Sequence, residues 1–199
     1  MAAVSVVLVP PLTRRRLTGL VAAATLGPAK AAEVLVAGRA PPEAVVARVA
    51  GGLGPRALAE AATGDVVVTL PGDGRHDPRF IPALVEALRD GAAVAVASRY
   101  VADGRDDSPP ARRLAARAVN VAATAFYPLG VADATSGFRA YSREALAFLR
   151  DAGEGPASNL RVLALARRRR LRVVEVPVVV RNPSADPMAR ETRGAVSNA

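Results

Sequence analysis

The chain has 199 residues, of which 51% are hydrophobic and 4% aromatic, and its formal net charge is +9. It contains no cysteine, which excludes disulfides, thiolate metal sites and a cysteine nucleophile and agrees with a reducing compartment. No apolar run reaches the roughly 18–20 residues that cross a bilayer. We therefore expect a cytoplasmic protein with one main domain, which meets the inner face of a membrane, if at all, only at its surface.

The positive charge has two interpretations. It fits an anionic partner such as a phosphorylated substrate or an anionic lipid. It also fits a compositional bias, because nearly all of it is arginine and Lys30 is the only lysine. A nucleic-acid partner is disfavoured, because the basic residues are not interleaved with aromatic ones.

Apolar runs alternate with helical patterns along the chain. Strands are predicted at 3–9, 33–37, 66–70 and 92–97. Helices are predicted at 12–26, 42–50, 56–62, 78–90, 111–127, from 142 onward and at 159–170. This alternation predicts a doubly wound α/β domain, with a mainly parallel central sheet flanked by helices. The loop at 101–110 is polar and expected to face solvent, and the tail at 185–199 is expected to be disordered.

The loop after the third predicted strand is a candidate ligand site, because open α/β sheets bind ligands beyond the carboxyl ends of their strands. It reads Pro71-Gly72-Asp73-Gly74-Arg75-His76, and Asp77 with Pro78 then predicts a helix start. Asp73 is a candidate metal ligand, but the local pattern by itself favours a turn residue. His76, the only histidine, is better explained as a loop or capping residue than as a general base.

Three further motifs lie in the second half of the chain. The fourth predicted strand ends in Ser98-Arg99-Tyr100. The Ala-rich helix at 111–127 carries polar residues that pattern alone would assign to a solvated face, namely Arg112, Arg113, Arg117 and Asn120. Residues 133–141 read Asp-Ala-Thr-Ser-Gly-Phe-Arg-Ala-Tyr, where the glycine permits close approach of the backbone and the polar side chains offer contacts to a ligand.

Together these motifs resemble family 2 glycosyltransferases with a GT-A fold, in the dolichol-phosphate mannose synthase-like branch, over roughly residues 3–184. In that family one strand ends in Asp-Ala-Asp-Gly-Gln-His and the next in Gly-Ser-Arg-Tyr. An arginine-bearing helix and then Asp-x-Thr-Ser-Gly-Phe-Arg follow. Residues 171–181 are similar to the family's closing strand, which contains Glu-Val-Pro, so the resemblance implies a strand there. The resemblance implies a single Rossmann-like GT-A domain over 1–184. It also implies metal-assisted, inverting transfer of a hexose from a nucleotide-sugar to a polyprenyl-phosphate-like or other acceptor.

The resemblance also implies roles for individual residues. Asp73 and Asp133 would be catalytic, and Asp73 would bind a divalent cation, Mg²⁺ or Mn²⁺. The implied substrate-binding residues are Arg99, Arg112, Arg113, Ser136, Arg139 and Arg181. A nucleotide-sugar donor and a phosphorylated lipid acceptor would be the partners, and the sequence indicates no oligomeric state.

The chain departs from the family pattern mainly in its donor half. Pro71 stands where the first Asp of the acidic motif belongs, so any cation would be weakly held. The family's Asp-Asp-Gly-Ser, whose Asp contacts the base, is replaced by Ala37-Gly38-Arg39-Ala40, and Ala116 replaces a serine that grips the acceptor phosphate. These departures leave an alternative open, which is a catalytically inactive GT-A domain that serves as a binding or regulatory partner.

Overall fold

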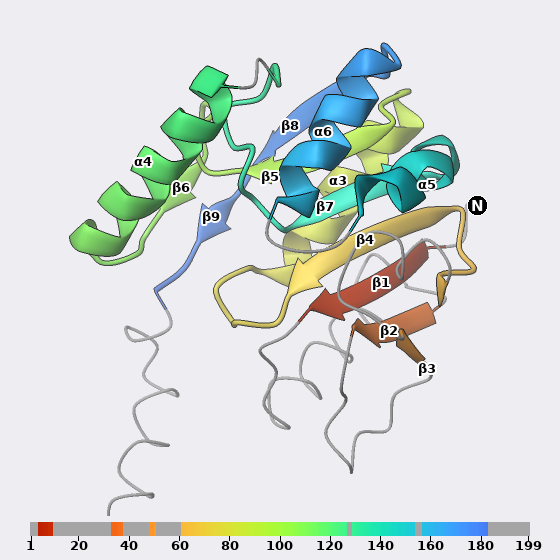
Figure 1. Cartoon of the computed structure of the whole chain (residues 1–199). Coiled ribbons are helices and arrows are strands. Elements are labelled where there is room, and N and C mark those ends of the chain that lie inside the picture. The colour runs from red at the N-terminus through yellow and green to blue at the C-terminus, as the bar shows by residue number, and fades with distance from the viewer. Residues whose placement is uncertain are drawn as a thin grey trace, which may run out of the picture.

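The computed structural model describes residues 4–9, 33–37, 48–50, 61–126, 129–153 and 157–182. Its main feature is a seven-stranded sheet in the order β3-β2-β1-β4-β7-β5-β8 (Figure 1). The strands are β1 (Val4–Val9), β2 (Glu33–Ala37), β3 (Arg48–Ala50), β4 (Val66–Pro71), β5 (Val94–Ser98), β7 (Arg139–Ser142) and β8 (Val173–Pro177). Only β7 runs antiparallel to its neighbours, β4 and β5, among these strands. The expected mainly parallel sheet is confirmed.

Helices cover both faces of this sheet (Figure 1). On one face α3 (Ile81–Arg89) buries its apolar side together with Val66, Val68 and Leu70 of β4. On the other face α5 (Arg143–Leu149) and α6 (Ser158–Arg168) pack in the same cluster as Val67. Successive residues of a strand point to opposite faces, so the unbroken apolar run of β4 serves both layers.

Two short 3₁₀ turns adjoin these helices, at η1 (Pro78–Phe80) and η2 (Arg150–Ala152). Asp77 caps η1, because its carboxylate accepts the backbone N–H of Arg79 at 3.0 Å. The expected cap and the expected position of Pro78 are confirmed. This turn fixes the direction in which the chain leaves the loop that follows β4.

A second, smaller unit lies at the β8 side of the sheet. There β6 (Arg105–Asp106) pairs in parallel with β9 (Val179–Val180), and α4 (Pro110–Phe126) stands outward beside them (Figure 1). The expected strand at 171–181 is thus divided, since β8 ends at Pro177 and β9 joins the smaller sheet. Asn120 is the only residue of α4 that is buried.

The structure corrects two expectations. The sequence predicts a helix over 42–50, but 48–50 form β3, because pairing with the open edge of β2 outweighs a weak local preference. The loop at 101–110 is not simply solvent-facing, because Asp106 and Ser108 are 7% and 3% exposed and bond to arginines. The helix expected at 12–26, most of that expected at 56–62 and the tail at 185–199 lie outside the described residues.

Candidate functional site

A cleft of about 430 Å³ lies where β4 and β5 end, beside the segment that leads into β7. We call it the Asp73 cleft. Its lining residues are Pro71, Asp73, Arg75, His76, Arg99, Arg112, Ala115, Ala116, Val119, Thr135, Ser136 and Gly137. The carboxyl ends of parallel strands are where α/β sheets place their ligands. Three arginines against one carboxylate make the lining suitable for an anion.

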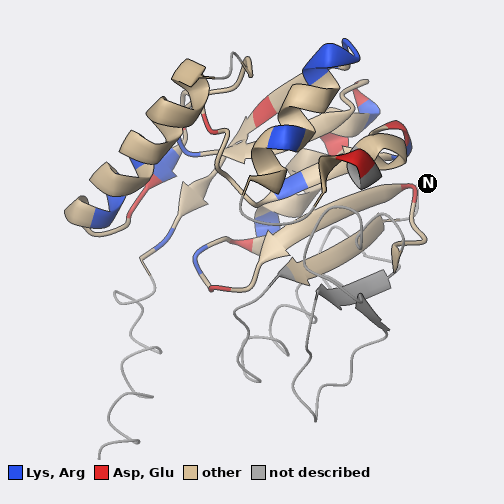
Figure 2. Cartoon of the chain, viewed as in Figure 1, with Lys and Arg blue, Asp and Glu red and all other residues tan. Residues whose placement is uncertain are grey.

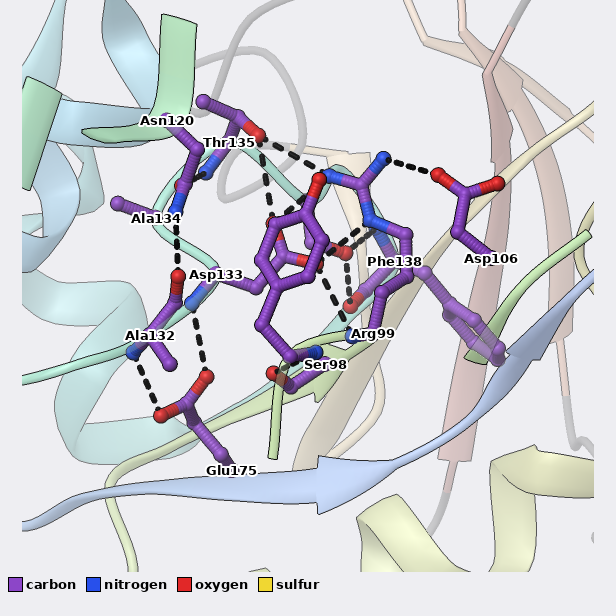
Figure 3. Close-up of polar contacts among 12 residues, drawn as sticks. Ser98, Arg99, Asp106, Asn120, Ala132, Asp133, Ala134, Thr135, Phe138 and Glu175 are labelled. Atoms are coloured by element: carbon purple, nitrogen blue, oxygen red, sulfur yellow. Dashed lines mark hydrogen bonds and ion pairs between the residues drawn. The ribbon is translucent and has the colours of Figure 1, made fainter. Parts of the chain in front are cut away.

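Beneath the cleft, Asp133 and Arg99 form a buried ion pair (Figure 3). The Asp133 carboxylate is fully buried and accepts Arg99 Nε at 2.7 Å, Nη2 at 2.8 Å and the backbone N–H at 3.1 Å. Glu175 of β8 holds the same segment in place, because its carboxylate accepts the backbone N–H groups of Ala132 and Asp133 at 2.7 and 2.9 Å. The strand pair β5–β8 therefore fixes the position of the Arg99 guanidinium.

This pair continues into a line of alternating charges. Arg99 Nη1 reaches Asp106 at 3.4 Å, and Asp106 in turn faces Arg75 at 3.5 Å, with Ser108 bonded to both. Asp106, Ser108 and Glu175 have structural roles that the sequence motifs do not reveal. Their roles depend on contacts with distant segments, since Asp106 and Ser108 meet arginines of other loops and Glu175 accepts backbone N–H groups of Ala132 and Asp133. The network joins the loop after β4 to β6 and to the end of β5.

The network favours the charged forms of Arg99 and Asp106 by shifting the pKa of each. Burial disfavours the Arg99 charge, but the bonds to Asp133 outweigh it and raise the pKa of Arg99 above its usual range. Burial also opposes ionisation of Asp106, but the hydrogen bonds from Ser108 and the charge of Arg99 hold its pKa below 3.8, the ordinary value. By contrast, burial and then the nearby charge of Arg112 lower the pKa of Arg75. Arg75 and Arg112 therefore act on one another across the cleft.

Acid should destabilise the protein partly through Asp106. A carboxylate whose folded pKa is lowered contributes stability that is complete above its unfolded pKa and is lost as the pH falls through its folded pKa. We expect the free energy of unfolding, measured with urea between pH 7 and pH 2.5, to fall below about pH 4. This loss of stability should be shallower in Asp106→Asn than in the wild type. Some loss should remain in the variant, because the pKa values of Asp73 and Asp77 are lowered too. Parallel curves for the two proteins would contradict the role given to Asp106.

Asp73 combines the two interpretations that its sequence context allows. Its Oδ1 accepts the backbone N–H of Arg75 at 3.1 Å, which is a turn contact, and lies 3.4 Å from His76 Nδ1. Its side chain also lines the cleft and is 25% exposed. Burial raises the pKa of Asp73, but the His76 and Arg75 bonds prevail and keep it below its ordinary value. The His76 ring packs edge-on against Phe138, with ring centroids 5.7 Å apart, which fits a loop role.

The side chains that could ligate a metal in this cleft fit a divalent cation only in part. Of the residues that the structure describes, Asp73 is the one carboxylate that lines it, and Pro71 offers no ligand. Among the described residues there is no group of three or more His, Cys, Asp or Glu side chains that could hold a metal ion. Asp73 with His76 would suit a cation that takes most of its ligands from a bound diphosphate, and not one held by the protein alone.

Comparison with known proteins agrees with this geometry. Residues 56–149 match the model of "Glycosyl transferase family 2". This segment belongs to glycosyltransferase family 2. It is distantly homologous to polyprenyl-phosphate and dolichol-phosphate mannosyltransferases, as the sequence motifs predict. The family match takes in the Asp73 loop, the Arg99 strand end, α4 and the 133–141 motif.

Two curated relatives of this family 2 chain illustrate the homology. Polyprenol monophosphomannose synthase of Mycolicibacterium smegmatis is 38% identical over 82 residues, which are 41% of this chain and 31% of that protein. Undecaprenyl-phosphate mannosyltransferase of Micrococcus luteus is 35% identical over 118 residues, which are 57% of this chain and 48% of that protein. The chain thus spans less than half the length of each.

Solved structures show that the family 2 chain has the GT-A fold. Glucosyl-3-phosphoglycerate synthase of Mycobacterium tuberculosis, in complex with Mn²⁺, UDP and phosphoglyceric acid, has a TM-score of 0.65 and 21% identity. The superposition covers 98% of this chain and 75% of the synthase. A second mycobacterial protein gives a TM-score of 0.67, at 21% identity, and covers 95% of this chain and 70% of that protein.

Helix α4 directs two neighbouring arginines, which the family resemblance assigns to one ligand, into different clefts. Arg112 lines the Asp73 cleft with Ala116, one turn later, as their spacing predicts. Arg113 lies on the opposite flank, where its Nη1 approaches the backbone oxygen of Asp106 at 3.5 Å. Adjacent helical residues point about 100° apart, so they do not face the same group. Arg112 is thus the one of the two that lines the Asp73 cleft, and the substrate-binding role expected of each stays a prediction.

Of the other expected substrate-binding residues, Ser136 lines the cleft, whereas Arg139 and Arg181 make contacts within the protein. Ser136 lines the cleft, and its hydroxyl accepts the backbone N–H of Phe138 at 3.3 Å. Arg139 is fully buried below the cleft, and its guanidinium donates to three backbone carbonyls, so it has no surface for a phosphate. Arg181 is outside the lining and fastens the chain to the loop, because its Nη2 donates to Asp77 at 2.8 Å.

The outer side of α4 is apolar and exposed. The large hydrophobic side chains that the structure leaves exposed, in its described part, all belong to this helix: Leu114 at 72%, Val119 at 63%, Val121 at 56% and Phe126 at 81%. The helix's charged residues are confined to its first half (Figure 2). Asn120 anchors the inner side, because its amide bonds the carbonyl of Ala132 and the N–H of Thr135. In the part of the chain described, no helix is long and apolar enough to cross a membrane.

Gly104 allows the backbone to fold closely over Arg99. A Cβ atom on Gly104 would lie 2.7 Å from the Ser98 carbonyl oxygen and 2.8 Å from the Arg99 carbonyl carbon. These are backbone atoms, so Gly104→Ala should lower the unfolding free energy by roughly 1–3 kcal/mol in urea denaturation. Gly137→Ala is the matched control, because its Cβ would make an ordinary contact of 3.6 Å with Pro71. Equal losses in the two variants would contradict this account.

Proposed function

We propose that residues 1–184 form a GT-A domain that transfers a hexose from a nucleotide-sugar to the phosphate of a polyprenyl-type lipid. The observation that carries the proposal is the Asp73 cleft, where three arginines and one carboxylate meet at the ends of β4 and β5. Family membership supports a glycosyl-transfer reaction. The mannosyltransferase relatives, by their names, support a lipid phosphate as acceptor.

The chemistry proposed is an inverting displacement. An oxygen of the acceptor phosphate attacks the anomeric carbon of the sugar while the bond from that carbon to the donor diphosphate breaks, and the electron pair leaves with the diphosphate. No proton has to be removed, because a phosphate group is already ionised. A divalent cation, when bound with the donor near Asp73 and His76, would supply positive charge to the departing diphosphate.

The chain's own residues have separate parts in this proposal. Arg75 and Arg99 bring positive charge to the floor of the cleft, where the diphosphate would lie. Asp133 is a positioning residue rather than a catalytic one, because its carboxylate is fully buried and bonds Arg99. Arg139 supports the carbonyls of the lining segment from below.

Arg112 and the outer side of α4 support the lipid nature of the acceptor. Within the described residues Arg112 forms no ion pair with a carboxylate, and it lies at the cleft next to Val119, which is 63% exposed. A phosphate at Arg112 would therefore leave its lipid chain beside an apolar surface. Amphipathic helices of this kind also bind membrane surfaces.

The proposal is tested by a transfer assay. The protein is incubated with UDP- and GDP-hexoses, a short polyprenyl phosphate in detergent micelles, and Mg²⁺ or Mn²⁺, and the glycosylated lipid is measured by mass spectrometry. Arg112→Gln should lower kcat/KM for the lipid by roughly 10–100-fold, the loss expected for one charged hydrogen bond. Arg89→Gln, an exposed arginine paired with Glu86 on α3, should leave it unchanged.

A catalytically inactive GT-A domain is the second candidate, and Pro71 in the cleft wall favours it. In that case no donor, cation and acceptor combination would give product or release nucleotide.

A further inference from the structure

A second cleft, of about 480 Å³, lies on the opposite flank of α4 from the Asp73 cleft. We call it the Tyr100 cleft. Its walls are α4, through Pro110, Arg113, Leu114 and Arg117, and the segment from Arg99 to Asp106. Arg99 is the one residue that lines both clefts, so the two hollows share a wall but are separate sites.

The Tyr100 cleft carries two arginines whose charge is not neutralised. Arg113 and Arg117 are one helical turn apart and face the same side of α4. Among the described residues, neither forms an ion pair with a carboxylate. The guanidinium of Arg113 approaches the backbone oxygen of Asp106 at 3.5 Å, and the guanidinium of Arg117 lies 5.6 Å from the centroid of the Tyr100 ring.

The carboxylate in this cleft does not balance them. Asp106 is only 3% exposed at its side chain, and Arg99, Arg75 and Ser108 already bond to it. Arg105, at the rim, is paired with Asp107 at 2.8 Å. The two free guanidinium groups therefore determine what the cleft attracts.

Tyr100 holds this arrangement in place. Its ring is in cation–π contact with two guanidinium groups, that of Arg99 at 4.9 Å and that of Arg117 at 5.6 Å from the ring centroid. Its hydroxyl is enclosed and has no hydrogen-bond partner within the described structure. The ring, and not the hydroxyl, is thus what orients Arg117 toward the cleft.

We propose that the Tyr100 cleft binds a phosphate group, gripped by Arg113 and Arg117, at a site separate from the transferase reaction. Two guanidinium forks one turn apart match the oxygens of a phosphate, which accept paired N–H donors. Leu114 and Pro110 border the cleft, so the phosphate belongs to an organic ligand with an apolar part next to it. A phospholipid headgroup and a small phosphorylated metabolite share this chemistry.

The test uses two probes and does not depend on a nucleotide or on turnover. In the first arm, inorganic phosphate and glycerol phosphate are titrated into the protein by calorimetry. In the second arm, the protein is sedimented with vesicles of phosphatidylcholine, alone or with phosphatidylglycerol. A headgroup ligand gives binding to the anionic vesicles only, and a metabolite gives binding in the titration.

In whichever arm binds, Arg113→Gln/Arg117→Gln should weaken binding at least tenfold. The double variant Arg89→Gln/Arg169→Gln removes the same charge from other exposed positions and should bind as the wild type does. Tyr100→Phe keeps the ring and should bind normally, whereas Tyr100→Leu should bind several-fold more weakly.

Three results would overturn the proposal. One is the absence of binding in both arms, and another is an equal loss in the two double variants, which would show a general charge effect. The third is an unchanged affinity in Arg113→Gln/Arg117→Gln. Because all the substituted arginines are exposed, circular dichroism and thermal unfolding are expected to show intact folding in each variant. Failure of glycosyl transfer would leave every one of these results unaffected.

Discussion

Replacing Arg139 by methionine should lower the unfolding free energy by roughly 3–5 kcal/mol, which is a large part of a domain's stability. Arg139 is the largest fully buried side chain in the described part of the chain. Its Nε, Nη1 and Nη2 donate to the backbone carbonyls of Ser136, Asn159 and Ala134 at 2.8, 2.8 and 2.7 Å. Methionine fills similar space but removes the guanidinium donors from these three carbonyls, two of them in fully buried bonds.

A graded series gives this prediction its control. Arg139→Lys keeps the charge but cannot direct donors along a planar fork, so it should fall between wild type and Arg139→Met in urea denaturation. Arg89→Met, at an exposed position, should change the unfolding free energy by less than about 1 kcal/mol. If Arg139 instead contacted substrate, its variants would lose activity and keep their stability, and this outcome would contradict the scaffold role.

The second large effect is expected at Asp133. Asp133→Asn removes the charge that faces Arg99, whose side chain is only 12% exposed and whose other carboxylate contact, Asp106, is at 3.4 Å. Removing one partner of a buried ion pair commonly lowers stability by about 3–5 kcal/mol, because the remaining charge is left without compensation. Donor binding should weaken as well, since Arg99 lines the Asp73 cleft.

A double-mutant cycle isolates this pair. Arg99→Met, Asp133→Asn and the double variant are compared by urea denaturation. The double variant should be more stable than the sum of the single losses predicts, by about 1–3 kcal/mol of coupling. Purely additive losses would mean that the two residues act independently, against the geometry of Figure 3.

Local sequence was sufficient to predict the elements that depend on burial on both faces or on contacts between near neighbours in the chain. The β-branched run at 66–70 is buried on both faces, so it predicts a central strand, and the structure contains one. Asp77 and Pro78 act through contacts within three residues, so the helix start is predictable too. The family motif at 133–141 was likewise sufficient to identify the fold.

Local sequence could not predict the features that depend on contacts between distant segments. Residues 139–142 form an antiparallel strand only because β4 and β5 leave a place between them. Asp106 and Ser108 belong to a sequence typical of an exposed loop, and they are buried because Arg75 and Arg99 reach them from other loops. The motif also suggests a phosphate contact for Arg139, whereas its side chain turns inward to backbone carbonyls.

The central proposal, that the Asp73 cleft takes a nucleotide-sugar, is tested most directly by calorimetric titration. UDP, GDP and their hexose conjugates are titrated into the wild type and Asp73→Ala, with and without Mn²⁺ or Mg²⁺. We predict that one nucleotide-sugar binds, that the cation strengthens its binding, and that Asp73→Ala weakens it at least tenfold. The absence of binding by any nucleotide at millimolar concentration would contradict the transferase proposal and favour a GT-A domain with a binding role alone.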